Sequence, residues 1–136
     1  PGGAEVRATL RTRRDERMAD LCAAAEALVA EIAGRHRLAA HHDYHDVFVA
    51  SVNAPDAVAH LRRALDEEGI PHGEEDLPMR GSEDFGVFGH GAASAMLFLG
   101  AGERHPALHN PDYDFPDDLI PIGSRIFMRT VRNILG

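Results

Sequence analysis

The sequence has 136 residues and a formal net charge of −8 at pH 7, and 44% of its residues are hydrophobic while 26% are charged. This balance is typical of a globular protein. The acidic surplus argues against nucleic acid or an anionic membrane as a partner, because a phosphate backbone attracts basic surfaces. No apolar run approaches the ~20 residues of a membrane span, and no basic and apolar leader opens the sequence, so we expect a cytoplasmic protein.

Residues 1–52 have the pattern of a strand, a helix and a second strand. Residues 5–12 alternate loosely with period two and predict a strand. Apolar side chains at three- and four-residue steps predict an amphipathic helix over residues 15–33, with Cys22 on its buried stripe. The β-branched and aromatic residues of 38–52 predict a second strand. So small a unit needs further strands to close its sheet, from missing sequence or from another chain.

The pattern changes at Asn53. Pro55 stands where the first residue of a helix is expected, and this helix should end near Gly69. Further on, Ser82 is a good N-cap, and the two acids after it favour the first turn of a short helix.

The apolar run 95–99 is bounded by glycines and predicts a strand that is buried on both faces. Helices should cover it, and one of them is expected to begin at Pro121. We therefore expect a layered α/β domain from residue 53 onward, joined to a smaller α+β unit over residues 1–52.

The loop from Gly100 to Asp118 is the first candidate site, because ligands of open α/β sheets gather at the carboxyl ends of the strands. Within it, His109 carries the side chain that most often ligates metals, and Asp112 or Asp114 could orient its other ring nitrogen. The alternative is a histidine in a surface loop, since a metal site needs three or four convergent ligands.

Three other groups have both a functional and a structural interpretation. His41, Asp43 and His45 share one face of a predicted strand, either as metal ligands or as a solvated face. Ser82 and the residues after it could present backbone N–H groups to an anion, or only cap a helix. Arg11 could hold a substrate carboxylate, or form a surface salt bridge. The motifs of the common phosphate-binding, nucleophilic and zinc-protease sites are absent, so these residues complete no catalytic constellation.

Four features in chain order carry a resemblance to a known family. They are Pro1 followed by the segment that ends in Leu10-Arg11-Thr12, then Gly81-Ser82-Glu83-Asp84-Phe85, then Leu99-Gly100-Ala101-Gly102, then Leu108-His109-Asn110-Pro111-Asp112-Tyr113-Asp114-Phe115. Together they resemble the C-terminal part of the M20 family of metallopeptidases and amidohydrolases. Within that family they are most similar to the aminoacylase-like branch, which includes hippurate and indoleacetyl-amino-acid hydrolases. The resemblance covers nearly the whole chain.

The resemblance implies an enzyme with an α/β catalytic domain and an inserted lid domain that also dimerises. Residues 1–52 would be the second half of the lid, and residues 53–136 the C-terminal segment of the catalytic domain. The chain opens on Pro1-Gly2-Gly3 without an initiator methionine, and we expect a fragment or a processed piece.

The resemblance also assigns residues to the site. The metal-ligating histidine of the family falls on His109, and the lid arginine associated with the substrate carboxylate falls on Arg11. Ser82, Glu83 and Asp84 would border the substrate pocket.

The implied reaction is hydrolysis of the amide bond of an N-acyl amino acid or small peptide. Two metal ions, zinc or else manganese, cobalt or nickel, lower the pKa of a bridging water, and a glutamate accepts its proton. That glutamate and the other ligands would lie before the start of this chain, so we expect the chain alone to be inactive and not to retain its metal.

Two alternatives to a fragment of such an enzyme stay open. One is a non-catalytic α/β module for dimerisation or small-molecule binding, and the other is a separate subunit completed in trans. The expected partners are a small N-acyl amino acid or peptide substrate, the missing N-terminal part of the same protein, and a second copy of the chain in a homodimer, because severed sheets expose apolar edges.

Overall fold

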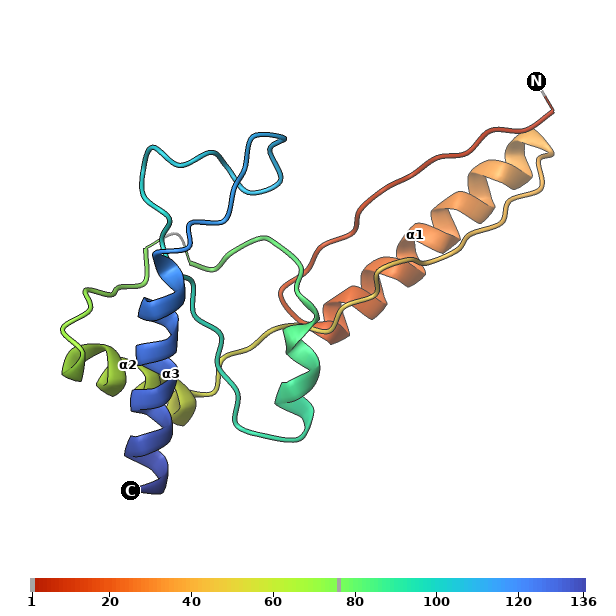
Figure 1. Ribbon diagram of the computed structural model, residues 1–136. Coiled ribbons are helices and arrows are strands. Elements are labelled where there is room, and N and C mark those ends of the chain that lie inside the picture. The colour runs from red at the N-terminus through yellow and green to blue at the C-terminus, as the bar shows by residue number, and fades with distance from the viewer. Residues whose placement is uncertain (1, 76) are drawn as a thin grey trace. The chain divides into compact units, whose positions relative to one another are not determined.

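The computed structural model describes residues 2–75 and 77–136 (Figure 1). Within these ranges the chain forms three α-helices and one 3-10 helix, joined by turns and extended segments. The α-helices are α1 (Asp15–His36), α2 (Pro55–Glu67) and α3 (Leu119–Leu135), and the 3-10 helix is η1 (Asp84–His90). In this described part of the chain, no helix has both the length and the apolar character that crossing a membrane requires.

The expected combination of α/β and α+β folds is wrong, because the described residues contain no strand and no sheet. Residues 5–12, 38–52 and 95–99 form no backbone ladder with one another. Period-two alternation and β propensity extend a segment locally, but a strand also needs a neighbouring strand for its backbone hydrogen bonds. In the second of these segments, Asp46 has a φ of 53°, which further interrupts the extended chain.

The three α-helices lie where the sequence predicts helices, with shifts at their ends. Helix α1 begins at Asp15 with acids in its first turn and basic residues in its last, which complements the helix dipole. It does not stop at Gly34, but continues until Arg37 adopts the left-handed conformation, with a φ of 56°. Helix α2 begins at Pro55 as predicted, whereas α3 begins at Leu119, two residues before the expected start.

The chain divides into two compact units. The first holds the residues up to Ser51 together with Pro78–Val87, and the second holds Val52–Leu77 together with Phe88–Gly136. The assignment of residues 1–52 to a lid and of residues 53–136 to a catalytic domain stays a prediction.

In the first unit, residues 38–50 leave the C-terminal end of α1 and run back toward its start (Figure 1). The Tyr44 hydroxyl donates a hydrogen bond to the Glu26 carboxylate at 2.7 Å, and His42 Nε2 lies 3.3 Å from the same carboxylate oxygen. The hydrogen bond to Glu26 raises the pKa of Tyr44 above its ordinary value. Near the start of α1, the Ala50 N–H donates to Asp15 Oδ1 at 2.8 Å. No residue of α1 is fully buried, and these polar contacts join the segment to the helix.

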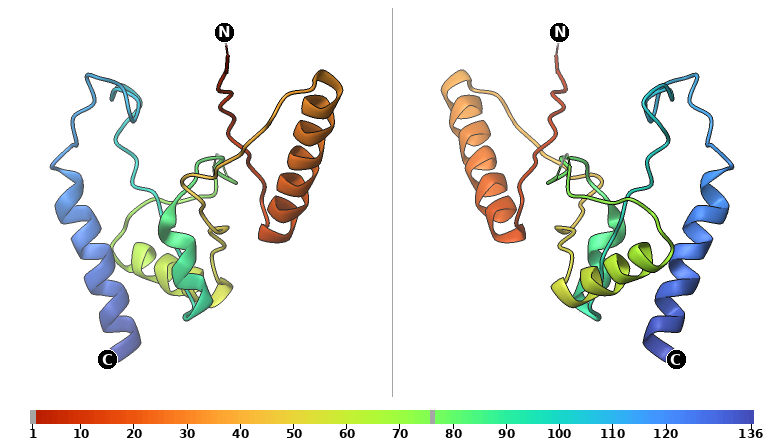
Figure 2. Two further views of the ribbon diagram at one scale, coloured as in Figure 1. Left: turned by 90° about the vertical axis from the view of Figure 1, so that its right-hand side faces the viewer. Right: turned by 90° about the vertical axis from the view of Figure 1, so that its left-hand side faces the viewer.

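In the second unit, α2 and α3 pack side by side (Figure 2). The buried hydrophobic residues among those described are Ala64 and Leu65 of α2 and Ile126 of α3. Gly123 lets α3 approach Leu99 closely, since an added Cβ would lie 3.3 Å from a methyl group of that leucine. The core of this unit is therefore small and lies between the two helices.

Charged and polar side chains join the same two helices. Arg129 Nε donates to the Glu68 carboxylate at 2.8 Å and lies 3.8 Å from the Glu67 carboxylate, and the Asn133 amide donates to Glu67 at 2.9 Å. Hydrogen bonds from Arg63 and Asn133 hold the pKa of Glu67 below its ordinary value. The bond to Glu68 raises the pKa of Arg129.

Asn53 fastens the start of the second unit to the predicted strand 95–99. Its side-chain amide accepts from the Met96 N–H and donates to the Met96 carbonyl, at 2.9 Å in each case. Next to it, the Ala54 N–H donates to the Ser94 carbonyl at 2.8 Å. One side chain thus supplies the pair of hydrogen bonds that a neighbouring strand would otherwise give.

Candidate functional site

The first unit brings together Arg11 and Ser82, two residues that the sequence singles out for substrate binding. Arg11 Nη1 donates to Ser82 Oγ at 2.6 Å and to the Arg80 carbonyl at 3.3 Å. These residues are exposed, and Arg11 has no carboxylate partner within the described part of the chain. Among the described residues, the surface salt bridge that is the alternative interpretation of Arg11 is not formed.

The position of residues 80–86 depends on a close backbone contact. Gly86 is buried, and an added Cβ would lie 2.6 Å from the Val49 carbonyl oxygen and 2.8 Å from that of Ala50. The same Ala50 donates its N–H to Asp15 at the start of α1. The segment that carries Ser82 is thus seated on residues 49–50, which are themselves tied to the helix that follows Arg11.

Glu83 and Asp84 follow Ser82 directly. Asp84 begins η1, one residue later than a cap at Ser82 predicts, and both carboxylates are exposed. Neither forms an ion pair with Arg11 among the described contacts. The Ser82 hydroxyl accepts a hydrogen bond from Arg11 Nη1 at 2.6 Å.

His109 belongs to the second unit, in a loop built from successive tight turns. The His105 N–H donates to the Gly102 carbonyl at 3.2 Å, the Asn110 N–H to that of Ala107 at 3.0 Å, and the Tyr113 N–H to that of Asn110 at 3.0 Å. His109 is the third residue of the middle turn and has a φ of 71°. This conformation is typical of glycine or asparagine, and histidine adopts it more readily than most other residues.

The imidazole of His109 is exposed and has no ligating neighbours in the described ranges. No group of three or more His, Cys, Asp or Glu side chains there could hold a metal ion. Asp112 and Asp114, the predicted partners of His109, form no described ion pair with it. An open hollow of about 680 Å³ in the same loop is lined by residues 101–106 and does not include His109.

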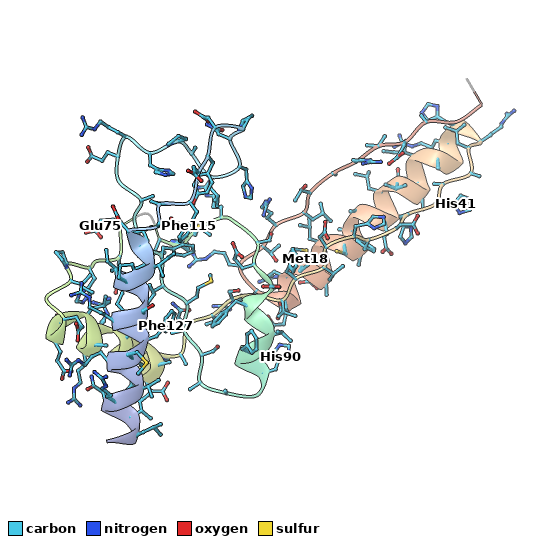
Figure 3. The ribbon with its side chains drawn as sticks, viewed as in Figure 1. Met18, His41, Glu75, His90, Phe115 and Phe127 are labelled. Carbon is cyan, nitrogen blue, oxygen red and sulfur yellow. The ribbon has the colours of Figure 1, made fainter. Side chains whose placement is uncertain are left out.

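The histidine cluster of the first unit does not form a metal site either. His41 projects outward from the segment that follows α1 (Figure 3), and His42 turns to Glu26 on the helix. Cys22, expected on a buried stripe, is half-buried with a free thiol. His41, Asp43 and His45 are exposed, and the described chain forms no strand there, so the shared strand face that both interpretations assumed is absent.

Comparison with known proteins shows the family to which the chain belongs. The family model "Peptidase family M20/M25/M40" matches residues 6–133. The chain belongs to this family. No curated protein and no solved structure gives a significant match.

Membership in the M20/M25/M40 family indicates a hydrolase of the peptidase or amidohydrolase kind. Enzymes of this family are generally metal-dependent. One exposed imidazole without convergent ligands does not fit such a metal by itself, because ligand number and geometry determine whether a site holds an ion. His109 is the residue of the described chain that matches the family's ligand motif, and its role as a ligand stays a prediction.

Three contacts of the first unit were not predicted from the sequence. The Arg80 carbonyl accepts from Arg11, Gly86 permits the close approach to residues 49–50, and Asp15 binds the Ala50 N–H. In the sequence, Gly86 directly after Asp84-Phe85 is the signal that could have predicted the close approach, since a glycine inside a short helix often marks such a contact.

Proposed function

We propose that this chain contributes part of the active site of a metal-dependent amidohydrolase, which hydrolyses the amide bond of N-acyl amino acids or small peptides. The observation that carries the proposal is the family match over residues 6–133. Within the family, the motifs around Ser82 and His109 favour the aminoacylase-like branch, which acts on hippurate and indoleacetyl amino acids. Faster hydrolysis of N-acyl amino acids than of dipeptides would favour this branch over the peptidases of the family.

Arg11 is the proposed binding group for the carboxylate of the substrate. Its guanidinium is exposed and has no carboxylate partner in the described residues, so its positive charge is available to a ligand. A guanidinium matches a planar carboxylate with two parallel hydrogen bonds, which a lysine does not offer. Ser82, Glu83 and Asp84 lie beside it in sequence and would form the border of the pocket.

His109 is the proposed metal ligand. The family match over residues 6–133 and the motif Leu108-His109-Asn110-Pro111 support this role. Zinc suits an imidazole ligand best, and manganese, cobalt or nickel would be alternatives. The remaining ligands, for two ions in all, and the glutamate base would come from residues outside the described ranges, in a preceding part of the same protein.

The coding sequence next to that of this chain provides the direct test. If the proposal is correct, the gene encodes a cluster of His or Cys residues and a paired-glutamate motif ahead of residue 1. A gene without these ligands would rule out the hydrolase in this form. The alternative, a subunit completed in trans, requires them in a separate gene.

The longer gene product, loaded with zinc, should hydrolyse N-benzoylglycine, an indoleacetyl amino acid or a dipeptide, and the chain described here should hydrolyse none of them. His109→Ala in the longer product should lower the hydrolysis rate by on the order of 100-fold or more, together with the bound zinc. Full activity and unchanged zinc content in that variant would refute His109 as a ligand.

A further inference from the structure

Arg11 is held by only one of its terminal nitrogens. Both described hydrogen bonds of its side chain come from Nη1, to Ser82 Oγ at 2.6 Å and to the Arg80 carbonyl at 3.3 Å. A guanidinium has five N–H donors in a fixed plane, and Nη1 provides two of them. The contacts to residues 80 and 82 therefore use the whole donor capacity of Nη1.

The opposite edge of the guanidinium makes no described contact. Nε and Nη2 carry the other three donors, and no acid lies within ion-pair distance of them in the described chain. This edge has the spacing of the two oxygens of a carboxylate, which it can bind by two parallel hydrogen bonds. The anchoring of Nη1 thus fixes the plane in which such a carboxylate would have to lie.

The anchoring groups are themselves held in place. Arg80 and Ser82 precede Gly86, whose missing side chain allows η1 to lie against the carbonyl groups of residues 49 and 50. An anchor on a supported segment removes rotamer freedom from a long, exposed arginine before a ligand arrives, and this reduces the entropy lost on binding.

We propose that Ser82 is a positioning residue, which orients Arg11 so that its Nε and Nη2 edge selects substrates with a free carboxylate over their amides. This inference rests on the proposed function, because it takes Arg11 as the group that binds the substrate carboxylate. It goes further in assigning the selectivity between acid and amide to Ser82, which touches the arginine and not the ligand.

The test compares the binding of N-benzoylglycine and N-benzoylglycinamide to this chain, followed by the backbone amide NMR signals of residues 10–12, which the wild type and every variant retain. The wild type should bind the acid about tenfold more tightly than the amide, since a charged pair with two hydrogen bonds replaces a neutral contact. Ser82→Ala should lower this preference about fivefold and leave the affinity for the amide unchanged. Ser82→Thr, which keeps a hydroxyl, should restore the preference.

Three control variants separate positioning from other effects. Ser51→Ala removes another exposed hydroxyl of the same unit that has no described side-chain hydrogen bond, and should leave the preference unchanged. Arg11→Lys keeps the charge without the planar edge, and should abolish most of the preference. Glu83→Gln removes a negative charge next to Ser82 and should strengthen binding of the acid slightly, opposite in sign to Ser82→Ala.

The outcomes separate this inference from the function on which it rests. A preference that disappears in Arg11→Lys but persists in Ser82→Ala overturns the positioning role alone. A wild-type chain that shows no preference, or binds neither probe, overturns both that role and the part of Arg11 in carboxylate binding. Hydrolysis by the longer gene product is measured independently. Its absence would contradict the proposed function, whereas the role of Ser82 is judged from the binding data.

Discussion

Gly86→Ala tests the contact on which the candidate substrate site is built. The new Cβ would lie 2.6 Å from the Val49 carbonyl oxygen, 2.8 Å from the Ala50 carbonyl oxygen and 3.0 Å from the Ala50 carbonyl carbon. All three atoms belong to the backbone, so no side chain can rotate away. Because ordinary contact begins near 3.4 Å, η1 and residues 49–50 would have to separate by roughly 0.8 Å.

Such overpacking costs about 1–3 kcal/mol. The displacement has a second effect, because Ala50 is also the donor to Asp15 and Ser82 lies on the displaced segment. We therefore expect a loss of about 2 kcal/mol in the free energy of unfolding, together with faster hydrogen exchange at the Ala50 N–H and a weaker preference for the acid probe.

The measurement is urea unfolding followed by circular dichroism, combined with amide hydrogen exchange of the first unit. Gly91→Ala is the matched control, because no atom lies within 4 Å of its added Cβ and its φ is not positive. This control should change stability by less than about 0.5 kcal/mol. If Gly86→Ala were as stable as the control and kept the protection of the Ala50 N–H, the close approach would not exist and the reasoning would be refuted.

Three further predictions concern other parts of the chain. Gly34→Ala should stabilise α1 by about 0.5–1 kcal/mol in urea unfolding, because the glycine is inside the helix and nothing lies within 4 Å of the added Cβ, and a destabilised variant would contradict this. Glu67→Gln should be less stable than the wild type at pH 7, because a lowered pKa gives stability that is present above the ordinary carboxyl pKa and lost as the pH falls through the folded value. The difference in unfolding free energy should shrink as the pH falls below the ordinary carboxyl pKa and close once it passes the lower folded pKa, and a gap independent of pH would exclude the carboxylate as its cause. His109→Asn should keep the stability of the chain within about 0.5 kcal/mol, since asparagine tolerates the left-handed conformation, while the longer gene product loses zinc in equilibrium dialysis.

Local signals determined what could be predicted of the fold. Pro55 and the acids after Arg14 set the starts of two helices, because the preferences for these positions arise within one turn of the chain. The sheet was predicted wrongly, because residues 5–12 and 95–99 have the composition of strands but no partner in the described chain. A pattern of period two indicates that a segment can pair, and pairing is decided by a second segment.

The candidate site shows the same limit. Arg11 and Ser82 were each identified from sequence, but the hydrogen bond between them joins residues that are 71 positions apart, and no local pattern predicts it. Gly86 was visible only as a glycine in a short helix, whereas its requirement comes from the carbonyl groups of residues 49–50. For His109, the functional interpretation comes from its motif, and its role as a metal ligand stays a prediction.

The exposure of α1 has a consequence for how the first unit folds. This helix of 22 residues buries none of them, and Leu28 and Val29 remain 54% and 46% exposed. Its stability must therefore come largely from its own alanine-rich sequence and its charged ends, and its length exceeds the ~12–15 residues below which isolated helices are marginal. A peptide of residues 15–36 should be partly helical in water. Because such a helix forms within microseconds, we expect it to be present before residues 38–50 return along it during folding.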